Sequence, residues 1–144
     1  MGLSNKNLKL IGASLYLCEG IKARVDNRGQ KNFSVEFTNK DPRMIRLFLN
    51  FLRKIVKPDE ERIKAQLFIY PDHKEEELIE FWSKITKIPF RRFTKTILLR
   101  QKNVRYKPNP LGTLKIRCHS KDHFLKIQNM IEEIFGKEKK WKDV

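Results

Sequence analysis

The chain has 144 residues, 40% of them hydrophobic, and carries 32 Lys and Arg against 17 Asp and Glu, which gives a formal net charge of +15. This length fits one domain with a modest core, and the hydrophobic content excludes a wholly disordered chain. The excess of cations argues against the balanced Lys and Glu surface of a thermophile. It favours a polyanionic partner, because each neutralised phosphate releases condensed counterions.

The sequence also argues against a membrane protein and a zinc module. No apolar run approaches the roughly 20 residues of a membrane-spanning helix, and residues 1–9 lack the apolar core of a signal peptide. Cys18 and Cys118 lie far apart with no CxxC motif, which leaves too few ligands for zinc. Both lie in apolar contexts and are predicted to be buried thiols. We therefore expect no membrane partner and a cytoplasmic protein, prokaryotic or organellar.

The first predicted element is a helix over residues 5–18, capped by Ser4 and ended by Gly20. Residues 12–14 are Gly, Ala and Ser, so part of the helix surface is unusually small. Its apolar positions recur at helical spacing, and they are Leu8, Ile11, Leu15 and Cys18.

Two strands are predicted next, at residues 21–25 and 32–38, with a turn at 27–30 between them. Along the second strand, Phe33, Val35 and Phe37 alternate with polar residues, so the two sets point to opposite faces.

A second helix is predicted to begin at Asp41-Pro42, with Asp as its cap, and to end at residues 57–59. The third strand covers residues 62–70, and a third helix covers 74–86 and is ended by Pro89.

Residues 91–110 form a basic stretch. Its first part, to Leu99, is predicted as a short helix or strand, and residues 101–109 are predicted as a loop. A fourth strand with alternating apolar residues follows at 112–119.

A final helix runs from its cap at Ser120 to Gly136, and a basic tail follows at 137–144. The element order predicts an α+β fold with a single domain at residues 1–136. In this fold four strands form one sheet with helices on one side.

The uncovered side of the predicted sheet carries mostly basic, amide and hydroxyl side chains, with Glu36 as an exception. Arg and Lys bind guanine and phosphate, Asn and Gln bind adenine, and Glu accepts from a cytosine amine. An ordinary solvated sheet face is the alternative, but it leaves the scarcity of acids unexplained. With the turn and the basic stretch, the predicted nucleic-acid surface consists of Lys22, Arg24, Asn27, Arg28, Lys31, Asn32, Ser34, Glu36, Thr38, Lys64, Gln66, Phe68, Lys95, Arg100, Lys102, Arg105, Lys107, Thr113, Lys115, Arg117 and His119.

The segment LIGASLYLCEG at residues 10–20 resembles the LAGLIDADG motif of homing endonucleases, a helix of small residues that ends in an acid followed by glycine. Leu17 replaces the middle acid of that motif. The later elements resemble the family's αββαββα unit, with an extra helix and basic loop between strands 3 and 4. FTNKDP at 37–42, together with FW at 81–82 followed by IP at 88–89, also resembles a prokaryotic branch of LAGLIDADG-like proteins.

The resemblance implies a homodimeric endonuclease that cleaves a long, near-palindromic DNA site, because a single motif per chain requires two chains. It implies that Glu19 and the Gly20 carbonyl hold Mg²⁺, or another divalent cation such as Mn²⁺ or Ca²⁺. Asn39 would orient water and Lys40 would support it. A helix-end carboxylate in a salt bridge is the alternative for Glu19. The predicted dimer interface consists of Ile11, Gly12, Ala13, Leu15 and Tyr16.

Three functions stay open at this point. The first is the metal-dependent homing endonuclease, and the second is a non-catalytic DNA-binding regulator that kept the fold. Both have double-stranded DNA as partner. The third is an intron maturase, the only one with RNA as partner.

Overall fold

The computed structural model describes residues 2–21, 24–25, 27–100, 109–136 and 138. Its α-helices are α1 (Asn5–Glu19), α2 (Pro42–Phe51), α3 (Glu75–Thr86) and α4 (Lys121–Phe135). A π-helical turn, η1 (Leu52–Val56), extends α2, and short 3-10 turns form η2 (Glu60–Arg62) and η3 (Phe90–Arg92). Its strands are β1 (Arg24–Val25), β2 (Lys31–Asn32), β3 (Ser34–Asn39), β4 (Ile63–Ile69), β5 (Ile97–Leu98) and β6 (Thr113–His119). The predicted α+β class is confirmed.

The main sheet has the order β3-β6-β4-β5. Its central strand β6 is antiparallel to both neighbours, and β5 runs parallel to β4 at the edge. The prediction for residues 91–99 named a helix or a strand, and both occur there, as η3 and β5. Leu99 N–H donates to the Ile69 carbonyl at 2.7 Å, which fixes β5 beside β4.

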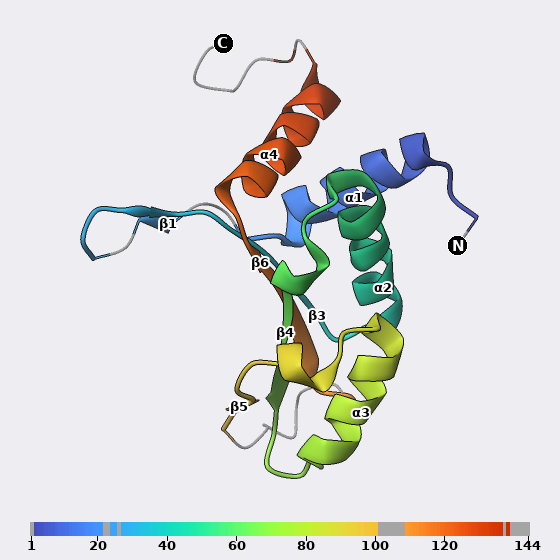
Figure 1. Cartoon of the computed structure of the whole chain (residues 1–144), viewed down its shortest axis with the longest axis vertical. Coiled ribbons are helices and arrows are strands. Elements are labelled where there is room, and N and C mark those ends of the chain that lie inside the picture. Colours follow the sequence, from blue (N-terminus) through green and yellow to red (C-terminus); the bar gives the residue numbers. More distant parts are fainter. Residues whose placement is uncertain (1, 22–23, 26, 101–108, 137, 139–144) are drawn as a thin grey trace.

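The first predicted strand is not a member of this sheet, which corrects the expected strand set. Instead β1 and β2 form a separate antiparallel ribbon that projects from the sheet as an arm (Figure 1). Only Phe33 separates β2 from β3, and Gly20 bridges Phe37.

The helix α2 begins at the cap that the sequence predicts, and the helices pack against the sheet. The Asp41 carboxylate accepts from Arg43 N–H at 2.9 Å and Pro42 occupies the first helical position of α2. At the other end Lys57 adopts φ 56°, which ends the helical stretch. The helices α1, α2 and α4 each contact β3, and α3 lies beside α2 (Figure 1).

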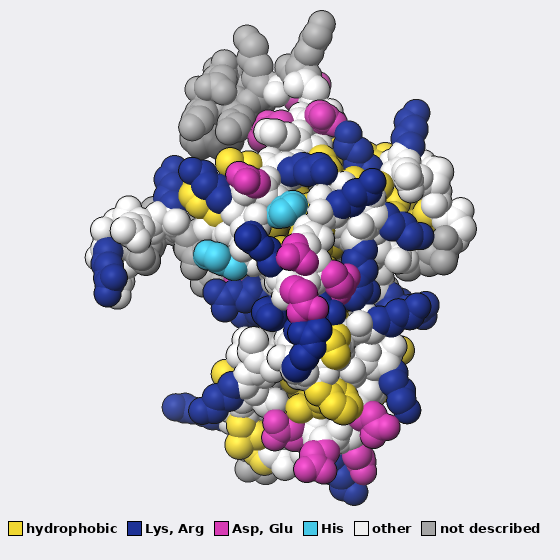
Figure 2. Space-filling model, viewed as in Figure 1, with side chains coloured by type: hydrophobic (Ala, Val, Ile, Leu, Met, Phe, Trp, Pro, Cys, Tyr) yellow, Lys and Arg dark blue, Asp and Glu magenta, His cyan; other side chains and the backbone are white. Residues whose placement is uncertain are grey.

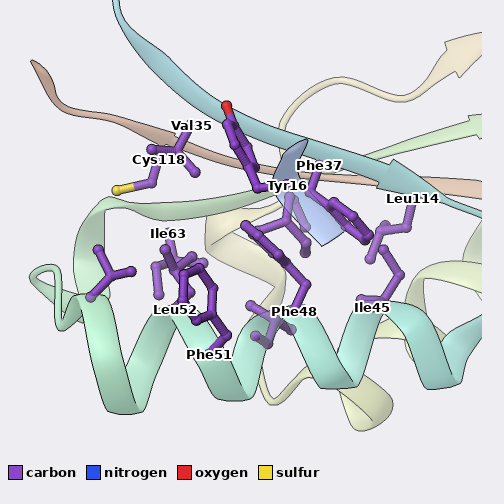
Figure 3. Close-up of a cluster of buried hydrophobic side chains, with 14 of the residues drawn as sticks. Tyr16, Val35, Phe37, Ile45, Phe48, Phe51, Leu52, Ile63, Leu114 and Cys118 are labelled. Carbon is purple, nitrogen blue, oxygen red and sulfur yellow. The ribbon is translucent and has the colours of Figure 1, made fainter. Parts of the chain in front are cut away.

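The core lies between these helices and the sheet, as Figure 3 shows. Phe48 on α2 stacks on Phe37 of β3 with ring centroids 4.4 Å apart, and both are fully buried. Trp82 is also buried and its Nε1–H donates to the Leu111 carbonyl at 2.8 Å, so it packs in the core. None of the helices in the described ranges is long and apolar enough to cross a bilayer.

Candidate nucleic-acid interface

The polar face of the sheet lies opposite the helices, because alternate residues of β4 and β6 are buried in the core. The strand register places Glu36, Arg117 and Lys64 side by side in one row across the sheet. The next row consists of Thr38, Lys115 and Gln66. The three strands thus bring together residues that the sequence analysis assigned to one face.

A hollow of about 300 Å³ opens on this face. The described residues that line it are Arg62, Lys64, Thr94, Arg117 and His119, and none of them is acidic. Arg62 continues the alternation of Lys64 and Gln66, so a strand period of two identifies it, although the prediction omitted it. Thr94 has no such signal in the sequence, since its N–H reaches the Ala65 carbonyl only through tertiary pairing.

Two residues of the second row make internal contacts as well. The Lys115 ammonium lies 5.2 Å from the centroid of the Phe68 ring. The ring therefore makes a cation–π contact with Lys115. The Gln66 amide donates to the Lys95 carbonyl at 2.9 Å, which ties the segment before β5 to β4. Phe68 and Gln66 therefore help to arrange the surface, in addition to facing it.

Ser34 and Glu36 are 5% exposed, so the expectation that they lie open to a ligand is wrong. The Glu36 carboxylate lies 3.3 Å from Arg117 Nε, and the Ser34 hydroxyl lies 3.4 Å from the same nitrogen. Arg117 itself is half exposed. The two buried residues therefore hold the Arg117 guanidinium in place, and Arg117 is the one that reaches solvent.

The other predicted surface residues spread around this centre. Thr38 and Thr113 are half-buried on the strands, and Asn27, Arg28 and Lys31 are exposed on the arm. The described basic residues beside β5 are also exposed, and they are Lys95 and Arg100. Outside the described residues lie Lys22, Lys102, Arg105 and Lys107, and also the side chains of Arg24 and Asn32. In Figure 2 acids lie at the centre of the view, over α3 and in the upper part of the molecule, and Lys and Arg side chains occur on every side.

Helix α1 buries only part of the predicted stripe, since Leu8 is buried, Ile11 and Leu15 are half-buried and Cys18 is exposed. Ala13 and Tyr16 are 1% and 0% exposed, and Gly12 is buried as well. A Cβ atom on Gly12 would lie 2.0 Å from Phe51 Cγ, so only glycine allows the end of α2 and α1 to approach this closely. The prediction that Gly12, Ala13 and Tyr16 form a dimer interface is therefore wrong, because the same chain covers them.

The described residues leave the opposite side of α1 partly open. A shallow depression of about 470 Å³ runs along it, lined by Leu10, Ile11, Ser14, Leu15, Cys18, Glu19 and Met44. Leu10 is 54% exposed and Cys18 is exposed, so the prediction of two buried thiols holds only for Cys118. Ile11 and Leu15, the two other residues of the predicted interface, lie on this open side.

Glu19 is exposed at the last position of α1. Among the described residues no hydrogen bond or ion pair engages its carboxylate. A Cβ atom on Gly20 would lie 2.3 Å from the Tyr16 ring, so the glycine after the acid has a steric role. Asn39 Oδ1 accepts from Asp41 N–H at 2.8 Å, which places this amide in the turn before α2, and Lys40 is exposed.

The part of the chain that the structure describes contains no cluster of three or more His, Cys, Asp or Glu side chains. Within one described chain, Glu19 therefore offers a single carboxylate to a cation, and a site with more acids requires a second chain.

Comparisons with known protein families, with curated proteins and with solved structures find no match for this chain.

Proposed function

We propose that this protein binds double-stranded DNA through the polar face of β3, β4 and β6 and acts as a homodimeric endonuclease of the LAGLIDADG homing type. The observation that carries the binding proposal is the hollow on that face, whose lining holds Arg62, Lys64, Arg117 and His119 and no described acid. A concave basic site of this kind suits the phosphates of a nucleic-acid backbone.

The shape and composition of the face favour a duplex over a single strand. Proteins that bind single strands place aromatic rings where bases can stack. Here the aromatic residue that β4 places on this face, Phe68, is half-buried and lies beside the Lys115 ammonium. The arm formed by β1 and β2 projects beyond the sheet edge and carries exposed Arg28 and Lys31, so it would lengthen the surface that follows a duplex.

The open side of α1 supports the homodimer. Leu10, Ser14 and Cys18 follow one another at a spacing of four residues, so they lie on one helix face, and the last two are small. Two such faces can approach closely about a two-fold axis. That pairing would bring the Glu19 carboxylates of two chains toward each other at the ends of the helices.

The donors at this position suit a hard divalent cation. Glu19 is exposed and presents carboxylate oxygens at a helix C-terminus, where the helix dipole also favours a cation. Glu19 and the Gly20 carbonyl would hold Mg²⁺, or Mn²⁺ or Ca²⁺ in its place. When bound, the cation would activate water and stabilise the leaving oxygen of the phosphodiester.

A DNA-binding regulator without nuclease activity is the second candidate. The turn formed by Asn39 favours it, because the amide oxygen that would orient water already accepts from Asp41 N–H. This candidate uses the same sheet face and differs only in what Glu19 does.

The binding proposal is tested by fluorescence anisotropy with duplexes of mixed sequence at several salt concentrations. Each phosphate contact contributes about 0.9 to the slope of log K against log salt, so Lys64→Gln and Lys115→Gln should each reduce the slope by about 0.9 per subunit. Lys74→Gln, at the N-cap of α3, removes the same charge from an exposed position and should leave the slope unchanged. Equal effects of all three substitutions would refute binding through this face.

The nuclease proposal is tested separately with Mg²⁺ or Mn²⁺ and a plasmid that carries the gene's own uninterrupted insertion site. The natural chain should cut both strands, and Glu19→Gln should bind the plasmid with unchanged affinity without cutting it. Cleavage by Glu19→Gln would contradict the role of the carboxylate. Binding by the natural chain without cleavage of its site would favour the regulator.

A further inference from the structure

We propose that a cavity on the helical side of the molecule is a second anion site, which binds a small ligand with two or more phosphate groups, such as a nucleoside triphosphate. The cavity has a volume of about 610 Å³ and lies between the outer side of α2 with η1, the end of α3, and the turns η2 and η3. This volume lies within the range of roughly 300–1,000 Å³ that small-molecule sites occupy.

The charge of the lining identifies the class of ligand. Six of the lining residues are cations and one is an acid, Glu60, so the lining has a formal charge of 6 − 1 = +5. The cations are Arg46, Arg53, Lys54, Lys84, Lys87 and Arg92. A ligand with one negative charge would leave most of this excess uncompensated, whereas a di- or triphosphate supplies several charges in a compact group.

The floor of the cavity is a fixed ion-pair network. Glu60 lies between two guanidinium groups, with Oε1 at 2.8 Å from Arg53 Nε and Oε2 at 2.9 Å from Arg92 Nη1. Burial alone would raise the pKa of Glu60, but the hydrogen bonds from Arg53 and Arg92 outweigh that effect and hold the pKa below its ordinary value. Arg53 Nη1 also donates to the Thr86 carbonyl at 2.7 Å. The two arginines are therefore held in position before any ligand arrives.

Arg92 carries the strongest sign of a missing partner. Arg92 is only 4% exposed, and its Nε–H has no acceptor among the described residues. Its Nη1 is shared among the Glu60 carboxylate, the Glu60 carbonyl and the Ile63 carbonyl. A buried guanidinium with an unsatisfied N–H is costly, and a ligand anion in the cavity beside it would compensate that charge.

The rim supplies cations that are available to a ligand. Arg46, Lys54 and Lys87 are exposed and form no ion pair within the described part of the chain. They come from two helices, α2 with η1 on one side and the end of α3 on the other, so their charges converge on the space between. Lys87 has φ 58°, a left-handed conformation that directs the chain sharply away at the end of α3.

This cavity is separate from the proposed DNA surface. The hollow on the sheet face is lined by residues of β4, β6 and their flanks, and the two cavities share no lining residue. The helix α2, whose outer side forms one wall, packs its inner side on β3 (Figures 1 and 3). Small-molecule binding here and duplex binding on the sheet are therefore expected to be independent.

Calorimetric titration of the full chain with ATP and with pyrophosphate tests the proposal, without divalent cations so that the phosphates keep their charge. The test variant combines Lys54→Gln with Lys87→Asn, because Asn tolerates the left-handed backbone at that position. We expect both probes to bind the natural chain and to bind this variant at least about tenfold more weakly, since charged hydrogen bonds are the stronger kind. Lys115→Gln on the sheet face should change the affinity less than about twofold.

Three results would overturn the proposal. One is that the natural chain binds neither probe, and another is that Lys115→Gln weakens binding as much as the rim variant. The third is that a short single-stranded oligonucleotide displaces ATP and binds more tightly through the same rim residues, which would assign the cavity to a nucleic-acid strand. Thermal melting of each variant establishes that it is folded, and Arg46→Gln provides a second rim variant if the double substitution unfolds the chain.

Discussion

The Tyr16 hydroxyl links the end of α1 to β3 through hydrogen bonds, and its removal should lower the free energy of unfolding. The ring is fully buried, with its centroid 5.9 Å from that of Phe48 and 6.4 Å from that of Phe124. Its hydroxyl donates to the Ile21 carbonyl at 2.6 Å and accepts from Glu36 N–H at 3.3 Å. Tyr16→Phe keeps the ring contacts and removes the partner of two backbone groups.

The expected cost follows from leaving those groups unsatisfied. We expect Tyr16→Phe to lower the free energy of unfolding by about 1–3 kcal/mol, the range for a buried polar group that loses its partner. Tyr16→Ala also removes the ring and should cost about 3–5 kcal/mol. Urea unfolding followed by circular dichroism measures both, and sedimentation follows the association state. A cost below about 0.5 kcal/mol for Tyr16→Phe, together with loss of dimer, would refute the burial of Tyr16 in its own chain.

Three further predictions test other parts of the structure. Gly12→Ala should lower the free energy of unfolding by roughly 1–3 kcal/mol, because the new methyl group meets the Phe51 ring, and an unchanged thermal midpoint would contradict that packing. Hydrogen bonding from Arg91 lowers the pKa of Glu61 from 4.5 to about 2. The natural chain should therefore exceed Glu61→Gln in free energy of unfolding by a full margin above pH 4.5, and that margin should decline as pH falls toward 2. Urea unfolding across that range checks this, and a pH-independent difference would contradict it. Cys18 should react with a thiol reagent in the folded chain and become protected as dimer forms, whereas the buried cysteine, whose pKa burial raises, should react only after unfolding. Equal reactivity of both thiols would contradict this arrangement.

Elements with local signals could be predicted from the sequence. The cap at Asp41-Pro42 and the alternation of β4 can each be recognised from neighbouring residues in the sequence, and both occur where expected. The cap at Ser120 likewise begins α4. Such signals need no knowledge of distant parts of the chain.

The buried side of α1 could not be predicted in this way. The helix carries apolar residues on two sides, and the side that faces the core is decided by the fit of Gly12 against Phe51 at the end of α2. Helical periodicity selected Leu8, which is buried, and also Ile11, Leu15 and Cys18, which line the depression on the partly open side. The result supports the dimer proposal, because the described residues leave this apolar side of α1 only partly covered.

The candidate site was predicted in outline and corrected in detail. Strand alternation placed Lys64, Lys115 and Arg117 on one face, and the register brings them into neighbouring rows. The burial of Glu36 depends on its contact with Arg117 across the sheet, which no local pattern encodes. The β5 strand depends in the same way on pairing with β4.

The most direct test of the central claim is to locate a bound duplex by amine-reactive labelling of the lysines, read by mass spectrometry with and without DNA. Binding through the sheet face predicts that the duplex protects Lys64 and Lys115 and leaves Lys74, at the N-cap of α3, as reactive as before. If Lys64 and Lys115 keep their full reactivity while the helical side is protected, the account of the sheet face as the nucleic-acid interface is contradicted.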